Sequence, residues 1–351
     1  MFKKQNNQKK LHKTLFRVII IVFSILLVLI LTLLILVGIG KNKLLNNSST
    51  NIIAPESLIE SQGESGKIIS YQGQKYEFNE DITNILLIGV DKDNLPQNSM
   101  QTFGTNGQAD VLLLMSLNTL TGQINAIPIS RDSMIDINIY SKSGQFLGVE
   151  NKQICLSYAY GDGREISCEN TVESVSRLLY GIPINSYIAI DINSIKRLND
   201  ALGGVTVTLS EDITLYDKVL KKGQSVTLKG EYALGYIRDR DEVDIEANND
   251  RMSRQKNYMK SFFNQALQMT KKDITTPIKL YNIASKYKVT NLSIADVTYL
   301  TKCVLLNKDA EPLSYLSISG KTSLGEKYVE FYPDQEKLYQ LIIKAFYKPI
   351  S

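Results

Sequence analysis

The stretch Asn84-Ile85-Leu86-Leu87-Ile88-Gly89-Val90-Asp91 contains the most informative strand signal of this chain. Its centre, Ile85–Val90, carries no polar side chain, which is typical of a strand buried on both faces. Two runs of the same kind follow at Val111–Leu117 and Ile124–Ile129, and the segment 118–122 between them has turn chemistry. The sequence therefore predicts three buried strands in succession.

Helices and strands alternate through the rest of the chain. Helical spacing is found at Val172–Tyr180, Ile192–Ala201, Arg251–Met269, Ile278–Tyr287, Ile294–Val304 and Gln335–Phe346. Further strands are predicted at Tyr187–Asp191, Val205–Leu209 and Tyr236–Arg240. This mixture predicts an α/β fold, with a mixed central sheet flanked by helices in an α/β/α sandwich.

A long apolar segment lies near the N-terminus. Residues 18–40 contain no charge, and their only hydroxyl groups are those of Ser24 and Thr32. About 20 apolar residues are enough to span a bilayer as a helix. A buried core helix would keep a polar face, and a cleaved signal peptide would have a shorter apolar region and a small-residue cleavage site. We therefore predict one retained transmembrane helix at residues 18–40.

The charges around this segment predict its orientation. Six basic residues and no acidic ones precede it, namely Lys3, Lys4, Lys9, Lys10, Lys13 and Arg17. Because basic residues stay on the cytoplasmic side, residues 1–17 are expected inside the cell membrane and everything after Gly40 outside. Residues 41–80 are rich in Asn, Ser, Gly and Gln and are predicted to be an extracellular linker with a short hairpin near Ile68–Tyr76. The compact extracellular domain is expected at residues 81–351.

Composition excludes several classes of chemistry from this outer part. It holds 34 basic and 36 acidic residues, so no bulk attraction to nucleic acid is indicated. The only histidine, His12, precedes the apolar segment. Ser-His-Asp catalysis, Cys-His catalysis and histidine-based zinc sites are therefore excluded there, which leaves carboxylates, basic groups, hydroxyls or a hard metal ion. Cys155 and Cys168 are close enough in sequence to pair, but unpaired buried thiols are an equally open interpretation.

Two carboxylates stand at predicted strand ends. Asp91 follows the first buried strand and Asp110 precedes the second. Ligands of α/β proteins bind just past strand ends, and two carboxylates there have the oxygen chemistry that Mg²⁺ prefers. The alternative is that each aspartate only caps or turns the chain.

Arginines gather in three other places. Arg131 follows the third strand beside Asp132, which alone is a weak signal. On a strand at 236–240, Arg238 and Arg240 would face one way, either around a phosphate or on a solvated edge. In the predicted helix that opens at Asp250, three polar residues share one face, namely Arg251, Arg254 and Gln255. Together with the two carboxylates, these arginines suit a site for pyrophosphate and Mg²⁺.

The chain resembles the LytR-CpsA-Psr family of bacterial envelope proteins over roughly residues 82–270. Seven segments carry the resemblance, in order: Asn84–Asp91, Asp110–Asn118, Pro128–Asp132, Ser157–Gly161, Leu198–Val205, Gly230–Arg240 and Arg251–Gln255. The resemblance implies a phosphotransferase that uses Mg²⁺ or Mn²⁺ to move a glycopolymer, such as teichoic acid or capsule, from a polyprenyl pyrophosphate carrier to peptidoglycan. An apolar cleft would take the lipid tail, and the anchor would keep the enzyme at the membrane lipid.

The resemblance also assigns roles to residues of this chain. Asp91 and Asp110 would bind the metal and, with Arg131, form the catalytic set. Five residues would bind the pyrophosphate, namely Arg131, Arg238, Arg240, Arg251 and Gln255. The attacking hydroxyl needs a base, for which Asp91 and Asp110 are the candidates. Three positions depart from the family pattern: Gln108 often an Arg, Gln153 in a stretch that often holds a Lys, and Asn248 often an Asp.

Two other functions are weighed against transfer. The departures at Gln108 and Asn248 motivate a non-catalytic binder or sensor of lipid-linked sugars that affects envelope regulation. A purely structural envelope protein would leave the arginines unexplained. Turnover discriminates, because a binder would retain the lipid pyrophosphate and release no polyprenyl phosphate.

Overall fold

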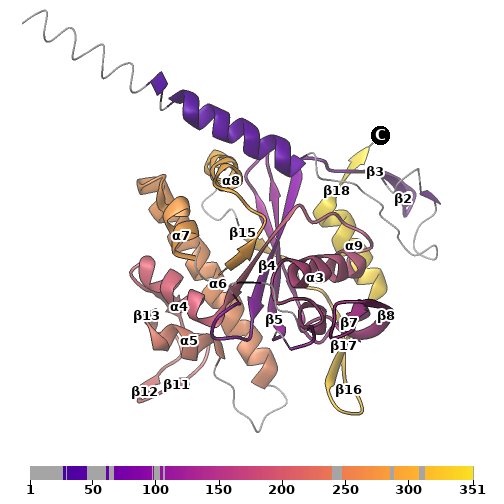
Figure 1. Cartoon of the computed structure of the whole chain (residues 1–351). Helices are drawn as coiled ribbons and strands as arrows, with labels where there is room; N and C mark the ends of the chain where they lie inside the picture. The colour runs from indigo at the N-terminus through magenta and orange to yellow at the C-terminus, as the bar shows by residue number, and fades with distance from the viewer. Residues whose placement is uncertain are drawn as a thin grey trace, which may run out of the picture.

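The centre of the molecule is a six-stranded mixed sheet (Figure 1). The computed structural model describes residues 27–28, 30–45, 61–62, 67–96, 98, 103–105, 107–238, 247–284, 288–307 and 313–350, without the side chains of 61–62 and 247–252. In spatial order the strands are β14 (Lys288–Thr290), β9 (Ser186–Asp191), β4 (Ile82–Val90), β5 (Ala109–Asn118), β6 (Ile124–Ile129) and β15 (Leu313–Tyr315). β4 is antiparallel to β5 and parallel to β9, so the predicted mixed sheet is confirmed.

Side chains alternate between the two faces of each strand, and both faces of this sheet are covered by helices. Leu86, Ile88 and Val90 of β4 pack in one core with α3 (Glu165–Leu178) and α9 (Gln335–Phe346). Ile85 and Leu87 face a second core with α8 (Ile294–Leu306) and α6 (Ala247–Lys272). Figure 1 shows α3 and α9 on one side of the sheet and α6 on the other. The predicted helix–sheet–helix layering is therefore present.

A third core lies beside the sheet, on the side of α6. In this core, buried side chains of four elements pack against that helix: α4 (Ile192–Ala201), α5 (Glu231–Arg238) and two hairpins. The hairpins are formed by β10 (Val205–Thr208) with β13 (Ser225–Leu228) and by β11 (Ile213–Leu215) with β12 (Lys218–Leu220). α7 (Thr276–Ala284) follows α6 and packs against both α4 and α8.

The remaining elements lie toward α3 and α9. One hairpin is formed by β7 (Met134–Tyr140) and β8 (Phe146–Gln153), is followed by α2 (Leu156–Ala159), and was not predicted. Another is formed by β16 (Gly320–Leu324) and β17 (Val329–Pro333). A small sheet contains β1 (Ser61–Gln62), β2 (Ile68–Tyr71), β3 (Gln74–Phe78) and β18 (Tyr347–Ile350).

That small sheet places the hairpin near Ile68–Tyr76 within the folded body. β3 pairs with β18 at the other end of the chain, and Ile69 and Phe78 are buried in the same core as α9. Residues 68–78 therefore belong to the compact domain, which begins before the predicted boundary at residue 81. The physical reason is that the hairpin's apolar side chains are covered by a helix about 270 residues later in the sequence, which no local composition reveals.

The predicted strand at Tyr236–Arg240 is wrong where the structure describes it. Residues up to Arg238 belong to α5, while residues 239–246 lie outside the described part. Ala233, Leu234, Tyr236 and Ile237 are buried, which is the i, i+1, i+3, i+4 pattern of a helix. The argument that Arg238 and Arg240 share a strand face therefore fails.

The N-terminal apolar segment is described only in part. Residues 30–45 are helical, but the predicted span begins at Val18, and residues 18–26 lie outside the described part of the chain. Among the described residues, no helix combines the length and the apolar character needed to cross a membrane. The anchor therefore stays a prediction from the sequence.

Arg254 on α6 is a structural residue rather than a free cation. Its Nη1 lies 2.7 Å from Glu211 Oε1, its Nε donates to the carbonyl of Tyr236 at 3.1 Å, and its side chain is 9% exposed. These contacts tie α6 to α5 and to the loop after β10. Arg254 was expected to share one helix face with Gln255. Its side chain is instead used to hold α6 against the neighbouring elements.

Replacing Arg254 by Ala is expected to lower the free energy of unfolding by about 2–3 kcal/mol. Removing one partner of a buried ion pair costs about 3–5 kcal/mol, and we expect less because the Glu211 side chain is 33% exposed. Denaturant titration would measure the loss. Lys256→Ala removes from the same helix an exposed cation whose Nζ lies 5.2 Å from the centre of the Tyr315 ring. Loss of this cation–π contact should cost less than about 1 kcal/mol. Equal losses would show that the Arg254 pair does not stabilise the fold.

Candidate active site

A pocket of about 200 Å³ lies at the carboxyl ends of β4 and β9. This is the place where α/β sheets bind ligands. Polar side chains line it together with apolar ones: Asp91, Asp110, Asp191, Arg238 and Gln255, and Val90, Val111, Ile192, Ile195 and Ile237. Residues from β4, β5, β9, α4, α5 and α6 therefore meet here, although almost 170 residues separate the first from the last.

The backbone around Gly89 positions Asp91. The pairing of β4 with β5 shifts register between Gly89 and Val90, and such a bulge redirects the following side chains. A Cβ on Gly89 would lie 2.9 Å from the Cβ of Val111, so only glycine lets the strands approach this closely. The amide of Asp91 donates to the carbonyl of Gln108 at 3.0 Å, and its side chain is left exposed at the pocket.

Arg131 forms an ion pair with Asp110. Its Nη1 lies 2.5 Å from Asp110 Oδ1, and its Nη2 donates to Gln108 Oε1. Arg131 is not among the residues that line the pocket, so it reaches the site through Asp110. Gln108, where the family often has Arg, thus acts as an acceptor that holds Arg131 against the carboxylate.

The second departure, Gln153, lies in the same network. Its Nε2 donates to Asp132 Oδ1 at 3.1 Å and to the carbonyl of Val329 at 2.8 Å. Cys155 lies beside Arg131, at 3.6 Å between Nη2 and Sγ. Burial raises the pKa of the Cys155 thiol more than the Arg131 guanidinium lowers it, so this cysteine is a neutral thiol. Cys155 and Cys168 are both free, so the open question of a disulfide is answered by two unpaired thiols.

Arg238 and Gln255 approach the pocket from its other side. Arg238 is the last residue of α5 and is exposed, and Gln255 Nε2 donates to the carbonyl of Ile237 at 3.1 Å. That bond holds α6 against the end of α5. Arg240 lies outside the described residues, as do the side chains of Arg251 and Asn248, so their predicted roles stay predictions.

Asp191 is a pocket residue that the sequence analysis missed. It ends β9, faces Val90 in the strand register and is 1% exposed. Its Oδ1 accepts from the amide and the hydroxyl of Ser194, both at 2.8 Å, which caps α4. Its Oδ2 is buried and has no hydrogen bond within normal distance and angle, although the backbone N–H of Leu95 lies close enough to the carboxylate to lower its pKa. Burial raises the pKa of Asp191 more than the Ser194 bonds lower it.

The signal for Asp191 was present in the sequence. It closes the predicted strand Tyr187–Asp191 in the same way that Asp91 closes the first strand. Because β4 and β9 are parallel neighbours, both strand ends meet at one edge of the sheet. The strand-end argument would have found Asp191 once the two strands were known to be adjacent.

The two carboxylates suit a divalent cation that is held partly by the protein and partly by a bound substrate. Asp91 and Asp110 line one pocket, and Mg²⁺ usually binds one or two carboxylates, substrate phosphates and water. Within the described ranges, no group of three or more His, Cys, Asp or Glu residues gathers as a metal site. The chemistry of the two carboxylates therefore fits such an ion, with part of its coordination supplied from outside the protein.

The fold and the pocket define an α/β protein with carboxylates, a guanidinium and an amide gathered at its strand ends. The chain belongs to the LytR_cpsA_psr family, whose model matches residues 52–345. This confirms the family that the sequence motifs indicated.

Individual relatives are similar at moderate identity. The polyisoprenyl-teichoic acid–peptidoglycan teichoic acid transferase TagU of Bacillus licheniformis is 28% identical over 219 residues, which are 62% of this chain and 63% of that protein. The match therefore spans less than two thirds of that relative. The crystal structure of TagV from B. subtilis has a TM-score of 0.59 at 23% identity and covers 76% of this chain and 96% of that chain. The structure of TagT bound to LI-WTA has a TM-score of 0.56 at 21% identity and covers 77% and 92%. These two structures show a shared fold.

Proposed function

We propose that this chain is a phosphotransferase that moves a glycopolymer from a polyprenyl pyrophosphate carrier to a hydroxyl of peptidoglycan. The observation that carries the proposal is one pocket that joins Asp91 and Asp110 to Arg238 and Gln255. Carboxylates for a cation and a guanidinium for phosphate oxygens are the groups that a pyrophosphate and its metal require. The name of the relative TagU makes teichoic acid the first polymer to test.

The reaction needs positioning and charge stabilisation more than covalent catalysis. A peptidoglycan hydroxyl oxygen forms a bond to the phosphorus that carries the sugar, and the bond from that phosphorus to the bridging oxygen breaks. Polyprenyl phosphate leaves with the electron pair. Arg238 is proposed to bind the phosphate oxygens, while Arg131 holds Asp110 in place. When bound at Asp91 and Asp110, Mg²⁺ or Mn²⁺ would supply charge stabilisation for the leaving phosphate.

Asp191 is the proposed acceptor of the hydroxyl proton. Its Oδ1 is fixed by Ser194, which orients the carboxylate, and besides Ser194 only the backbone N–H of Leu95 acts on the carboxylate as a hydrogen-bond donor in the described part of the chain. Asp110 is already paired with Arg131 and both Asp91 and Asp110 are assigned to the cation. This leaves Asp191 as the pocket carboxylate best suited to take a proton, in place of the two candidates named from the sequence.

The proposed activity is tested with the full chain in nanodiscs that contain a polyprenyl-pyrophosphate-linked teichoic acid, with peptidoglycan fragments added. We expect polymer–peptidoglycan product and free polyprenyl phosphate. Chelation should lower both at least tenfold, and Mg²⁺ or Mn²⁺ should restore them, because charge on the leaving phosphate would lose its counter-ion. Turnover that persists in chelator would contradict the proposed cofactor.

The same assay decides between transfer and binding. Gln108 and Asn248 stand where the family often has charged side chains, and these departures motivate a binder or sensor of lipid-linked sugars as the second candidate. A binder would retain the lipid pyrophosphate and release no polyprenyl phosphate. The proposed location is the cell membrane, with residues 1–17 cytoplasmic, a single span at 18–40 and the domain extracellular. Protease added to wall-stripped cells should digest the domain, and a protected domain would contradict this orientation.

A further inference from the structure

The C-terminal end of the N-terminal helix is packed tightly against the start of α8. A Cβ on Gly40 would lie 2.4 Å from the carbonyl oxygen of Ala295 and 3.0 Å from the Cβ of Tyr299. No residue larger than glycine fits there without moving one of the two helices. The contact is therefore a specific packing site between two segments that are about 250 residues apart in sequence.

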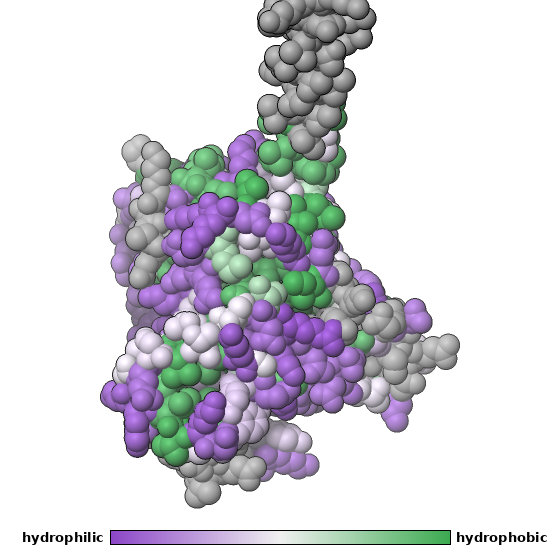
Figure 2. Space-filling model, turned by 90° about the vertical axis from the view of Figure 1, so that its left-hand side faces the viewer, coloured by the Kyte–Doolittle hydropathy of each residue, from purple (hydrophilic) through white to green (hydrophobic). Residues whose placement is uncertain are grey.

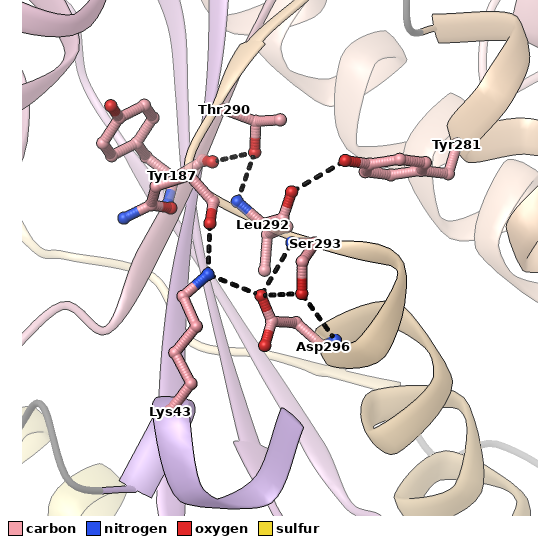
Figure 3. A network of polar contacts seen from close by, with 8 residues as sticks. Lys43, Tyr187, Tyr281, Thr290, Leu292, Ser293 and Asp296 are labelled. Carbon is pink, nitrogen blue, oxygen red and sulfur yellow. Dashed lines mark hydrogen bonds and ion pairs between the residues drawn. The ribbon is translucent and has the colours of Figure 1, made fainter. Parts of the chain in front are cut away.

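A charged pair next to this contact holds the two helices together (Figure 3). Lys43 Nζ lies 2.7 Å from Asp296 Oδ2 and also donates to the carbonyl of Asn291. The Asp296 side chain is 0% exposed, and Lys43 is the only cation paired with it in the described part of the chain. The amide and hydroxyl of Ser293 donate to the same Oδ2, at 2.7 and 2.8 Å. A buried carboxylate needs such compensation, so release of Lys43 would leave its charge unpaired.

The next residue ties the helix to the central sheet. Leu44 is 0% exposed in the core with α8, and its carbonyl accepts from Asn185 Nδ2 at 2.8 Å. Asn185 Oδ1 in turn accepts from the amide of Asn84 on β4 at 2.7 Å. Asp91 follows the other end of β4, roughly 23 Å from Asn84 at the rise of an extended strand. We call the contacts of Gly40, Lys43 and Leu44 the helix dock.

We propose that the helix dock makes the N-terminal helix and the domain one rigid unit, which holds the pocket at a fixed height and direction relative to the membrane. The inference rests on the proposed function, because it assumes a membrane-borne substrate. Lys43 and Gly40 act as positioning residues, since neither reaches the pocket. The dock begins at Gly40, the last residue of the predicted span, so α8 lies at the bilayer surface.

The surface around the dock agrees with this placement. Figure 2 shows hydrophobic side chains gathered around the base of the N-terminal helix. On α8 the exposed side chains include Ile294 and Leu306, at 44% and 52%, together with Lys302. Apolar groups beside a lysine are suited to the boundary between acyl chains and lipid head groups.

The test compares Lys43→Ala with Lys41→Ala in the full chain in nanodiscs. Both remove one lysine charge, but Lys41 is exposed two positions earlier on the same helix. Spin labels at Leu34→Cys and Lys302→Cys report the distance between the helix and α8, because the three native cysteines are buried. We expect a narrow distance distribution in the parent, in Lys41→Ala and in the charge-conserving Lys43→Arg, and a broad one in Lys43→Ala. A distribution that stays narrow in Lys43→Ala would overturn the proposal.

A transfer assay separates positioning from stability. Lys43→Ala should lower transfer from a long-chain lipid donor in the same nanodisc about 10-fold, because misplaced reactants react more slowly. Transfer from a short-chain, water-soluble pyrophosphate donor should stay within about 2-fold of the parent, because that donor diffuses to the pocket. Equal losses with both donors would show a folding defect and contradict the proposal. If the parent transfers from neither donor, the proposed function fails, while the spin-label distances still decide whether the helix dock is rigid.

Discussion

Asp191→Asn is expected to lower polymer transfer about 100-fold or more while the melting temperature stays near that of the parent. General acid–base catalysis contributes about 10²–10⁴-fold, and an amide cannot accept the proton. The fold should persist because Asn is as good an N-cap as Asp and its side-chain oxygen can still accept from Ser194. Initial rates of polyprenyl phosphate release and thermal melting of the same preparation measure the two effects.

Two further variants separate the role of the Asp191 carboxylate in transfer from its role as the N-cap of α4. Asp191→Ala removes both the carboxylate and the cap of α4, so it should lose transfer and also about 1 kcal/mol of stability. Ser194→Ala removes only the hydroxyl donor to Oδ1 and should leave most of the transfer rate. Normal transfer by Asp191→Asn would show that the proton acceptor is elsewhere and that Asp191 serves only as a helix cap.

Arg238→Ala is expected to lower transfer about 10- to 100-fold at nearly unchanged stability. A hydrogen bond to a charged group contributes about 1.5–3 kcal/mol, and loss of one such bond to the pyrophosphate gives this range. Arg238 is exposed and has no ion pair with a described residue, so its own contribution to the fold is the interaction with the C-terminal end of α5, less than about 1 kcal/mol. Donor binding and the transfer rate would be measured beside the melting temperature.

The controls for Arg238 come from its own neighbourhood. Lys229→Ala removes an exposed cation just before α5, outside the pocket, and should leave transfer unchanged. Arg238→Lys keeps the charge but loses the bidentate fork, so we expect a partial loss. If Arg238→Ala binds and transfers like the parent, the pyrophosphate lies elsewhere. If it unfolds, Arg238 is structural, in the way that Arg254 is.

Much of the fold could be predicted because its signals are local. The strands at Ile85–Val90 and Tyr187–Asp191 are apolar runs with few competing interpretations, and β4 and β9 confirm them. The predicted strand at Tyr236–Arg240 was wrong because five residues of alternation are too few to distinguish a strand from the end of a helix. The β7–β8 hairpin was missed although β7 alternates apolar and polar residues, because its partner β8 is largely exposed and carries little apolar pattern.

The candidate site could also be predicted in part, because some of its signals are local. Asp91, Asp110, Arg238 and Gln255 do meet in one pocket, and their assigned roles stay predictions. The strand-end rule placed the two aspartates, and the family resemblance placed Arg238 and Gln255. Asp191 escaped notice because its value depends on which strand lies next to β4, which local pattern does not reveal.

The sequence by itself determined the α/β class, the apolar N-terminal segment and the absence of histidine chemistry from the rest of the chain. Only the tertiary structure decided which charged groups are structural and which remain available. Arg254 and Gln255 are adjacent in sequence, yet one pairs with Glu211 and the other lines the pocket. Lys43 meets Asp296 across 253 residues. The physical reason is that apolar periodicity is a property of neighbouring residues, whereas the partner of a charge is chosen by the packing of distant elements.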